Sequence, residues 1–391
     1  MRSSMRTAGL MAVLLTAAVF GTVNQVANAA PSPTGVGHRA VKVCAAPVAG
    51  TAECHSWVRT DASPQVTPSG YGPADLTSAY NLTSAGSASQ TIAIVDAFDD
   101  PTAEADLAVY RSQYGLPACT TANGCFRKID QNGGTHYPRR DSGWALEISL
   151  DLDMASAICP NCHILLVEAK TNSFANLGAA ENRAAAQGAN VISNSWGGSD
   201  TSDSTYGAYF NHPGIAITVS SGDGGYGAEY PASSHYVTAV GGTHLTAGGG
   251  TRGWTETAWS GAGSGCSAYN TALSGAASFN TGCTRRAVAD VSAVADPNTG
   301  VAVYDTTSYQ GRSGWFVVGG TSASAPIIAG VYALAGNESS IDNNYPYTHS
   351  SSFFDVTSGS NGSCPTSQWC TARTGWDGPT GLGTPNGTGG F

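Results

Sequence analysis

Short apolar runs alternate with longer amphipathic segments along most of the chain. Residues 91–96 form an apolar run that ends in an acid, which is typical of a strand buried in a parallel sheet. Residues 103–114 follow with acids near their start and predict a helix. The same pattern continues and predicts strands at 163–168, 190–194, 214–220 and 235–240, and helices at 142–157 and 174–187.

This alternation predicts an α/β fold with a mostly parallel central sheet and helices on both faces. Such sheets carry their chemistry in the loops beyond the carboxyl ends of the strands. With 391 residues, 41% of them hydrophobic, the chain can form one large core or two modest ones. Residues 30–70 are rich in Pro, Ala, Ser and Thr without a sustained period, and we interpret them as a short N-terminal arm.

Residues 1–29 have the pattern of a signal peptide. Arg2 and Arg6 precede an apolar stretch at 10–23, and Ala27-Asn28-Ala29 provides small residues at a cleavage site. A membrane anchor is the alternative, but the apolar run is shorter than the ~20 residues that a span needs. We therefore expect a secreted, extracellular protein.

The charge balance limits the classes of partner. The chain carries 17 basic and 27 acidic residues, a net charge of −10, and loss of two arginines with the signal would make it −12. An acidic surface argues against nucleic acid and against anionic membranes as partners.

Ten cysteines lie after the predicted signal in close pairs. In an exported chain, an even number in local pairs predicts disulfides between neighbours. The pairs are Cys44/Cys54, Cys119/Cys125, Cys159/Cys162, Cys266/Cys283 and Cys364/Cys370. Zinc is the alternative at Cys159-Pro-Asn-Cys162-His163, but no second CxxC or HxxxH completes such a site.

A serine near a glycine pair is the clearest chemical signal. The segment 319–326 reads Gly-Gly-Thr-Ser-Ala-Ser-Ala-Pro and precedes an apolar run at 327–335, which predicts a buried helix with Pro326 in its first turn. Ser322 would stand at the helix start, near backbone N–H groups, as a nucleophile for acyl transfer does. A simple helix cap is the alternative.

Gly-Thr-Ser-x-x-x-Pro is the serine motif of the subtilisin-like clan, and the stretch 290–300 resembles its sedolisin branch, the serine-carboxyl peptidases. The resemblance covers about residues 71–386 and implies a subtilisin-like fold that hydrolyses peptide bonds in polypeptide substrates through an acyl-enzyme. Subtilisins use a histidine followed by Gly-Thr, and none of the eight histidines is so placed. Another base must therefore activate the serine.

Glu147 and Asp151 are candidates for that base. Four residues apart on the predicted helix, both carboxyl groups share one face, where mutual repulsion makes one keep its proton. A solvated acidic face is the alternative, although the helix has no lysine or arginine. By resemblance to the sedolisin pattern Glu-x-x-x-Asp, Glu147 is the general base and Asp151 orients it.

Asp223 follows a predicted strand within Ser-Ser-Gly-Asp-Gly-Gly. A glycine-rich turn with a capping aspartate is the simpler interpretation. In sedolisins an aspartic acid stands in this context, so the resemblance implies that a protonated Asp223 donates to the oxyanion beside the Ser322 N–H. Because an ionised Asp223 would repel the developing charge, we expect activity only at acidic pH.

The resemblance also implies two binding segments. Ser195, Trp196 and Gly197 fall in the segment that pairs with extended substrate. The chain end resembles the calcium site of sedolisins, with carboxylates from Asp355 and Asp377 and carbonyls from Val356, Arg373 and Gly375. Sedolisins usually have glycine at the position of Arg373, a change that a carbonyl ligand tolerates. Two aspartates in turns are the alternative to Ca²⁺.

Two features depart from the pattern. Sedolisins are normally made with a long folded pro-domain, whereas here residues 30–70 alone separate the predicted signal from the catalytic domain; either the chain folds without that helper or the arm takes part of its role. Asp96 stands where subtilisins hold an aspartate, and we interpret it as a strand-end acid. We expect a monomeric peptidase of endo or tripeptidyl type, and the alternative is a secreted binding protein on a catalytically retired scaffold.

Overall fold

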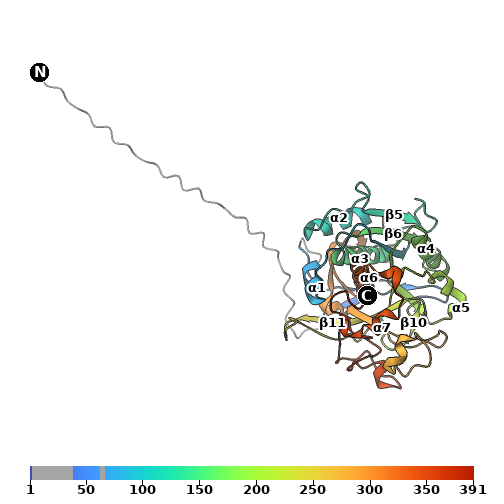
Figure 1. Ribbon diagram of the computed structural model, residues 1–391. Coiled ribbons are helices and arrows are strands. Elements are labelled where there is room, and N and C mark those ends of the chain that lie inside the picture. Colours follow the sequence, from blue (N-terminus) through green and yellow to red (C-terminus); the bar gives the residue numbers. More distant parts are fainter. Residues whose placement is uncertain (2–37, 62–66) are drawn as a thin grey trace.

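The computed structural model describes Met1, residues 38–61 and residues 67–391 (Figure 1). The predicted signal peptide therefore lies outside the described residues. Across the part of the chain that is described, no helix has both the length and the apolar character to cross a membrane.

A central sheet of eight strands runs through the molecule in the order β12-β11-β9-β7-β4-β6-β5, with β15 also beside β11. All neighbours are parallel except β12, which is antiparallel to β11, so the predicted α/β class is confirmed. The strands are β4 (Thr91–Ala97), β5 (Phe126–Asp130), β6 (His163–Ala169), β7 (Val191–Asn194), β9 (Ala216–Ser220), β11 (Thr238–Ala247), β12 (Trp254–Ala258) and β15 (Val291–Val294).

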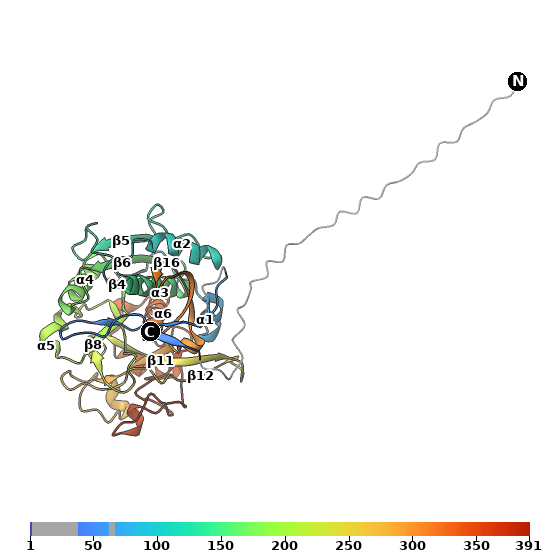
Figure 2. The same cartoon turned by 180° about the vertical axis from the view of Figure 1, so that it is seen from behind.

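Helices cover both faces of this sheet, as Figures 1 and 2 show. Helices α3 (Ser142–Ile158) and α6 (Thr321–Ala335) pack together on one face, and α4 (Phe174–Ala186) packs on strands β4 and β6 from the other. Helix α3 is buried on all sides because a second sheet covers it, which explains its lack of a polar stripe. The other α-helices are α1 (Pro73–Ala79), α2 (Ala103–Gln113), α5 (Asp203–Tyr206) and α7 (Tyr345–Thr348).

The second sheet is antiparallel and was not anticipated from the sequence. Its order is β1 (Ala40–Lys42), β3 (Trp57–Arg59), β17 (Arg312–Gly319) and β16 (Val301–Tyr309). The hairpin between β16 and β17 turns at Gln310 and Gly311, both at positive φ, which suits the twist of a two-residue turn. Strand β17 leads directly into helix α6 and so positions its first turn.

Several short strands complete the fold. They are β2 (Glu53–Cys54), β8 (Trp196–Ser199), β10 (Glu229–Tyr230), β13 (Gly265–Cys266), β14 (Ala287–Val288), β18 (Phe353–Phe354) and β19 (Thr384–Pro385). The N-terminal arm thus contains strands β1, β2 and β3, although its sequence has no strand-like period.

Two details of the predicted elements were wrong. Strand β11 begins at Thr238 rather than at residue 235, because residues 231–237 form turns. Helix α6 begins at Thr321, next to Ser322 as predicted, but Pro326 therefore lies in its second turn and not in its first. Proline cannot donate to the carbonyl four residues earlier, and the Ser195 hydroxyl contacts that Ser322 carbonyl at 3.3 Å instead.

All five predicted disulfides are present in the structure. Cys159 and Cys162 bond to each other, so the zinc alternative at these two residues was wrong. One bridge, Cys44–Cys54, closes a loop within the N-terminal arm.

Candidate active site

Three parallel strands and one helix converge where the candidate residues lie. Asp96 lies near the end of strand β4, Ser195 follows β7, and the turn that carries Asp223 follows β9. The first turn of α6 brings Ser322 to the same edge. This is the edge at which open parallel sheets hold their ligands.

Ser322 is fully buried in the first turn of α6. Its hydroxyl donates a hydrogen bond to the Ser195 carbonyl at 3.1 Å. The preceding Gly320 has φ +98°, and a Cβ there would collide with the carbonyl oxygen of His55, so glycine is required at this position. The predicted glycine-dependent approach of a backbone is therefore present.

Glu147 and Asp151 both lie on α3 and are fully buried, which excludes the alternative of a solvated acidic face. Burial raises the pKa of Glu147 to about 8, and the nearby Ser322 and Ser56 hydroxyls oppose that rise. Neither carboxyl oxygen of Glu147 has a hydrogen-bond partner within the described residues. Glu147 thus lies near Ser322, and either of its carboxyl oxygens could accept a proton.

Asp151 is held in place by the Ser195 hydroxyl, which donates to its Oδ1 at 2.8 Å. Burial, followed by repulsion from Asp96 and Glu147, raises the pKa of Asp151 well above its usual range. The two helix carboxyls therefore resist holding two negative charges at once.

Asp96 belongs to the same carboxyl cluster, which the sequence analysis did not foresee. It is fully buried, and burial followed by repulsion from Glu147 and Glu168 raises its pKa. The strand-end position was predicted, but its proximity to α3 depends on helix packing that no local pattern reveals.

Asp223 is oriented by the helix start. Its Oδ1 accepts hydrogen bonds from the Thr321 N–H and hydroxyl, each at 2.8 Å. Its Oδ2 has no partner within the described chain and would lie 2.7 Å from a Cβ built on Gly320. Burial raises the pKa of Asp223 to about 7, and the nearby His55 opposes that rise. A proton on Oδ2 at acidic pH would face the space over Gly320.

The predicted substrate segment forms the central strand of a small sheet. Strand β8 pairs with β10 on one side and with β2 of the N-terminal arm on the other. Gly197 pairs with Glu53, and the Ser195 carbonyl accepts the His55 N–H at 3.1 Å. Trp196 takes part through its backbone, because its indole is buried and donates to the Val95 carbonyl at 2.8 Å. In Figure 2 the blue segment of the arm crosses the molecule near β8.

Two further residues at this site were missed from the sequence. His55 is buried and contacts Glu229 through Nε2 at 3.0 Å and Ser220 through Nδ1 at 2.7 Å. Burial alone would lower the pKa of His55, but the Glu229 carboxylate raises it to about 9. Both ring nitrogens are engaged, so His55 is not placed to act as the base for Ser322.

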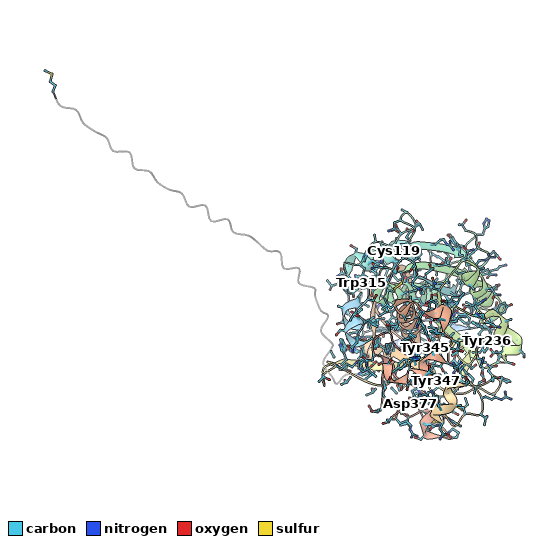
Figure 3. All side chains as sticks on the ribbon, in the orientation of Figure 1. Cys119, Tyr236, Trp315, Tyr345, Tyr347 and Asp377 are labelled. Atoms are coloured by element: carbon cyan, nitrogen blue, oxygen red, sulfur yellow. A yellow bond between two sulfur atoms is a disulfide. The ribbon has the colours of Figure 1, made fainter. Side chains whose placement is uncertain are left out.

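The predicted calcium ligands lie together in the C-terminal loops. Asp377, labelled in Figure 3, is buried, and its Oδ2 accepts the Arg373 N–H at 3.0 Å. Asp355 Oδ2 accepts the Gly375 N–H at 2.9 Å. Burial raises the pKa of Asp377 to about 7, and the adjacent Asp355 adds to that rise.

The oxygen atoms that these C-terminal loops offer are suitable ligands for a hard cation. Within the described residues, no hydrogen bond goes to the carbonyls of Val356, Arg373 or Gly375, so these oxygens remain available beside two carboxyl groups. Ca²⁺ prefers such a mixture of carboxylate and carbonyl oxygens.

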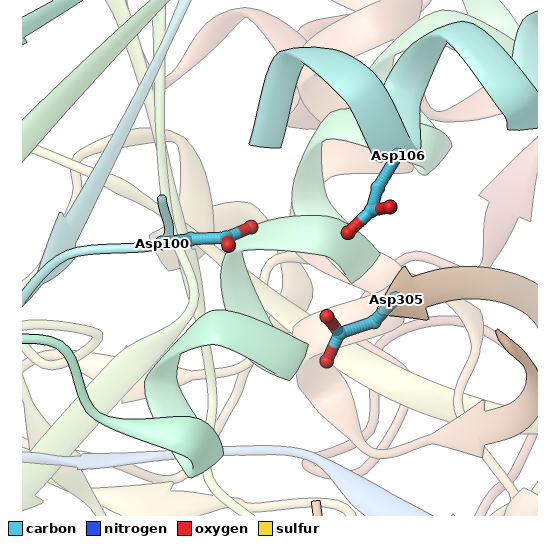
Figure 4. Close-up of side chains that lie close together, drawn as sticks. All are labelled: Asp100, Asp106 and Asp305. Carbon is cyan, nitrogen blue, oxygen red and sulfur yellow. The ribbon is translucent and has the colours of Figure 1, made fainter. Parts of the chain in front are cut away.

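A second acidic group was not predicted. Asp100, Asp106 and Asp305 each offer a carboxyl oxygen, and these oxygens lie within 4.8 Å of one another (Figure 4). The group could hold a metal ion, yet Thr102 and Thr306 already donate to Asp100 and Asp106 through their hydroxyls. These hydrogen bonds can hold the carboxyls in place without an ion.

The chain is similar in sequence and structure to known peptidases. Residues 139–349, more than half of the chain, match the subtilase family. The chain belongs to the subtilase family. Within that family it is most similar to peptidases of the sedolisin branch among the proteins compared below.

Kumamolisin from Bacillus sp. (strain MN-32) is 29% identical over 370 residues, covering 83% of this chain and 64% of that protein. Tripeptidyl-peptidase sed1 from Aspergillus fumigatus is 30% identical over 230 residues, covering 44% of this chain and 34% of its own length. The solved structure of Pseudomonas sedolisin (serine-carboxyl proteinase), complexed with two molecules of pseudo-iodotyrostatin, has a TM-score of 0.67 and 26% identity. That match covers 82% of this chain and 96% of the solved one. This chain therefore spans less than two thirds of the length of these two sequence relatives.

The buried carboxyl groups predict that the stability of this protein falls as pH rises. The pKa of Glu147 is about 8 in the folded state against an ordinary 4.5, so its stabilising effect is complete below pH 4.5 and is lost as pH rises towards 8. In a Ser322→Ala background, we expect Glu147→Gln to reduce this loss by on the order of 4 kcal/mol, measured by urea unfolding between pH 4 and pH 8.5. Glu104 is less buried than Glu147, so Glu104→Gln serves as the matched control. Its free energy of unfolding should keep the pH dependence of the parent protein. An unchanged pH dependence in Glu147→Gln would contradict the buried, protonated state.

Proposed function

We propose that this chain is a secreted, acid-acting serine-carboxyl peptidase that hydrolyses peptide bonds in polypeptides. One observation supports this most strongly: a peptide carbonyl, that of His55, accepts the Ser322 N–H at 2.9 Å, next to Glu147 and Asp223. A serine hydroxyl, a base and an anion-binding donor thus surround a peptide bond, which are the parts that acyl transfer needs.

The proton path follows from the shared charge of Glu147 and Asp151. A fully neutral pair cannot accept a proton, so the reactive form is the one in which the two carboxyls share a single negative charge. Because burial raises both pKa values, this form is a minor fraction of the free enzyme at acidic pH. Glu147 accepts the Ser322 hydroxyl proton as the oxygen attacks the carbonyl carbon, and returns it to the leaving amine. Asp151, held by Ser195, takes up the remaining proton and keeps Glu147 oriented.

The oxyanion is held by the Ser322 N–H and by the protonated Oδ2 of Asp223. Thr321 occupies the other oxygen of Asp223, so the proton belongs on the oxygen that faces the substrate carbonyl. Because the pKa of Asp223 is about 7, the donor is present below that pH and lost above it. This supports activity limited to acidic and near-neutral pH.

Substrate binds as an added strand along Ser195, Trp196 and Gly197, through backbone groups that accept many sequences. Cleavage yields an ester on Ser322, which water then hydrolyses. The pattern at residues 1–29 and the five disulfides support export to an oxidising compartment, with the protein acting as a monomer in the extracellular space.

The decisive test compares wild type with Ser322→Ala on a denatured protein from pH 3 to pH 8, after pre-incubation at acidic pH. We expect wild-type cleavage at low pH and a loss of at least about a thousandfold in the variant, because the nucleophile is gone. Ser324→Ala is the matched control, since Ser324 is buried on the same helix and donates to the Ala293 and Val294 carbonyls instead. Equal inactivity of wild type and Ser322→Ala would favour a binding protein on a retired scaffold.

We also propose that Asp355 and Asp377, with the Val356, Arg373 and Gly375 carbonyls, hold one Ca²⁺. The ion would neutralise two adjacent carboxyls that no cationic side chain of the described residues pairs with. Its role would be structural, since it would join the segment after β18 to the final loops.

Removal of calcium should therefore lower stability. We expect a chelator to lower Tm by several degrees in Ser322→Ala protein, and added Ca²⁺ to restore it. Asp377→Asn should lower Tm without a chelator and abolish the calcium response. Asp342→Asn, an exposed acid elsewhere, should respond as the parent does. A parent protein whose Tm ignores both chelator and Ca²⁺ would exclude the site.

A further inference from the structure

A cavity of about 270 Å³ lies at the edge of the central sheet opposite the candidate active site. Strands β9 and β11 begin beside it, at Ala216 and Thr238, whereas the candidate residues follow the ends of parallel strands. Helix α6 reaches from one edge to the other, because Ser322 is in its first turn and Tyr332, which lines the cavity, is in its last. Ten residues of α-helix span about 15 Å, so an occupant of the cavity would not touch Ser322.

The wall of the cavity is largely apolar and aromatic on its inner side. Phe210, Ile217 and Tyr332 line it, and each of them is buried. The hydroxyls of Tyr332 and Thr238 lie 3.0 Å apart and share a hydrogen bond. Tyr236, labelled in Figure 3, also lines the cavity and is exposed. Such walls favour a ligand with an apolar part.

Two acids give the cavity a negative charge. Glu338 is 5% exposed, and its Oε1 accepts a hydrogen bond from Asn190 Nδ2 at 2.9 Å. Its Oε2 is buried and has no hydrogen-bond partner within the described residues. Asp342 lines the same cavity and is exposed. Neither acid forms an ion pair in the described part of the chain, and no lysine or arginine lines the cavity there, so the protein leaves this charge uncompensated.

The end of helix α6 adds to the negative potential. Its C-cap is Gly336, and the last carbonyls of a helix carry a partial negative charge that attracts cations. His212 also lines the cavity, and burial lowers its pKa, so this ring adds no positive charge near neutral pH. The helix end and the two acids therefore act in the same direction, and both favour a cation.

A metal ion does not explain these groups. Within the described residues, Asp100, Asp106 and Asp305 form the one group of three or more acid, histidine or cysteine side chains that lie close enough to share an ion. The acids and imidazoles of the cavity are not among them. The cavity is slightly smaller than the range of about 300 to 1,000 Å³ that holds drug-sized ligands, so it suits a small organic molecule or a single side chain.

From these contacts we propose that the cavity binds a guanidinium or ammonium group on a short apolar stem, as in the side chain of arginine or lysine. The charged group lies against Glu338, where its N–H donors supply the partner that Oε2 lacks, and the stem packs against Phe210 and Ile217. Such a group comes either from a free amino acid or from a residue of a polypeptide. This inference does not rest on the proposed function, because the cavity and Ser322 lie at opposite edges of the sheet.

The test measures binding to Ser322→Ala protein at pH 7 by isothermal titration calorimetry. We expect Nα-acetyl-arginine amide to bind about tenfold more tightly than the citrulline derivative of the same shape, because the urea group of citrulline has no charge. Free arginine and a Gly-Gly-Arg-Gly-Gly peptide separate the two sources. Tighter binding of the free amino acid assigns a small molecule, and tighter binding of the peptide assigns a polypeptide. Equal binding of the arginine and citrulline derivatives would overturn the proposal.

Removal of single charges tests whether the two acids hold the cation. Glu338→Gln should weaken binding of Nα-acetyl-arginine amide by about tenfold, since the buried partner of the cation loses its charge. Asp342→Asn should weaken it by about threefold, because this acid is exposed and its charge is screened. Glu181→Gln changes a buried glutamate that does not line the cavity, so it is the matched control and should bind as the parent does. Unchanged binding in both Glu338→Gln and Asp342→Asn would overturn the proposal.

A further measurement needs no variant at the cavity. The chain has eight histidines, and two of them, His212 and His235, line the cavity. Addition of Nα-acetyl-arginine amide should shift the NMR signals of these two rings and leave those of His55, which contacts Glu229, in place. A shift of the His55 signals without a shift of His212 or His235 would place the cation beside Glu229 and contradict a site in the cavity.

Discussion

The burial of carboxyl groups that form no ion pair within the described residues is the constraint on which this molecule depends. Asp96, Glu147, Asp151 and Asp223 lie around one serine, and desolvation raises the pKa of each of them. A conventional serine peptidase would place a histidine base here and work near neutral pH. Here the acids can act as proton carriers and donors because the surrounding sheet and helices exclude water.

The fold supplies that environment by enclosing helix α3. The helix lies between the central sheet and the β16–β17 hairpin, so acids on it cannot reach solvent by turning outward. The same hairpin leads into α6 and fixes Ser322. A single packing arrangement therefore buries Glu147, the proposed base, and positions Ser322, the proposed nucleophile, so the two cannot be adjusted independently.

The arm shares this dependence, because its strand β2 covers the site and completes its exclusion of water. Its His55 brings a positive charge near Asp223 and Glu229, and the His55–Glu229 contact spans 174 positions of sequence. A part of the chain that the sequence marks as irregular thus contacts the candidate site directly.

Sequence patterns predicted much of this structure where the cause is local. Strand β4 and helices α2, α3 and α4 were placed within one or two residues, because buried strands and helices have clear periods. The β16–β17 hairpin was missed because its turn, Gln310-Gly311, is not a strong hairpin signal. Resemblance to sedolisins brought Glu147, Asp151, Asp223 and Ser322 together, and the structure places them at one sheet edge.

What sequence reasoning missed depends on tertiary contacts. His55 and Glu229 carry no motif, and Asp96 joins the carboxyl cluster only through the packing of α3 on β4. Pro326 was expected in the first turn of α6 and lies in the second, where the Ser195 hydroxyl stands 3.3 Å from the Ser322 carbonyl that proline leaves without a donor. Only the packed structure brings such partners close together.

The most direct measurement of the central claim is the pH dependence of kcat for Asp223→Asn beside wild type, on one peptide substrate. An asparagine amide donates at every pH, whereas the pKa of Asp223 is about 7. The account predicts that the high-pH decline of wild type, near pH 7, moves up by about one unit in the variant while the low-pH limb stays in place. An unchanged high-pH limb in Asp223→Asn would contradict a protonated carboxyl as the oxyanion donor.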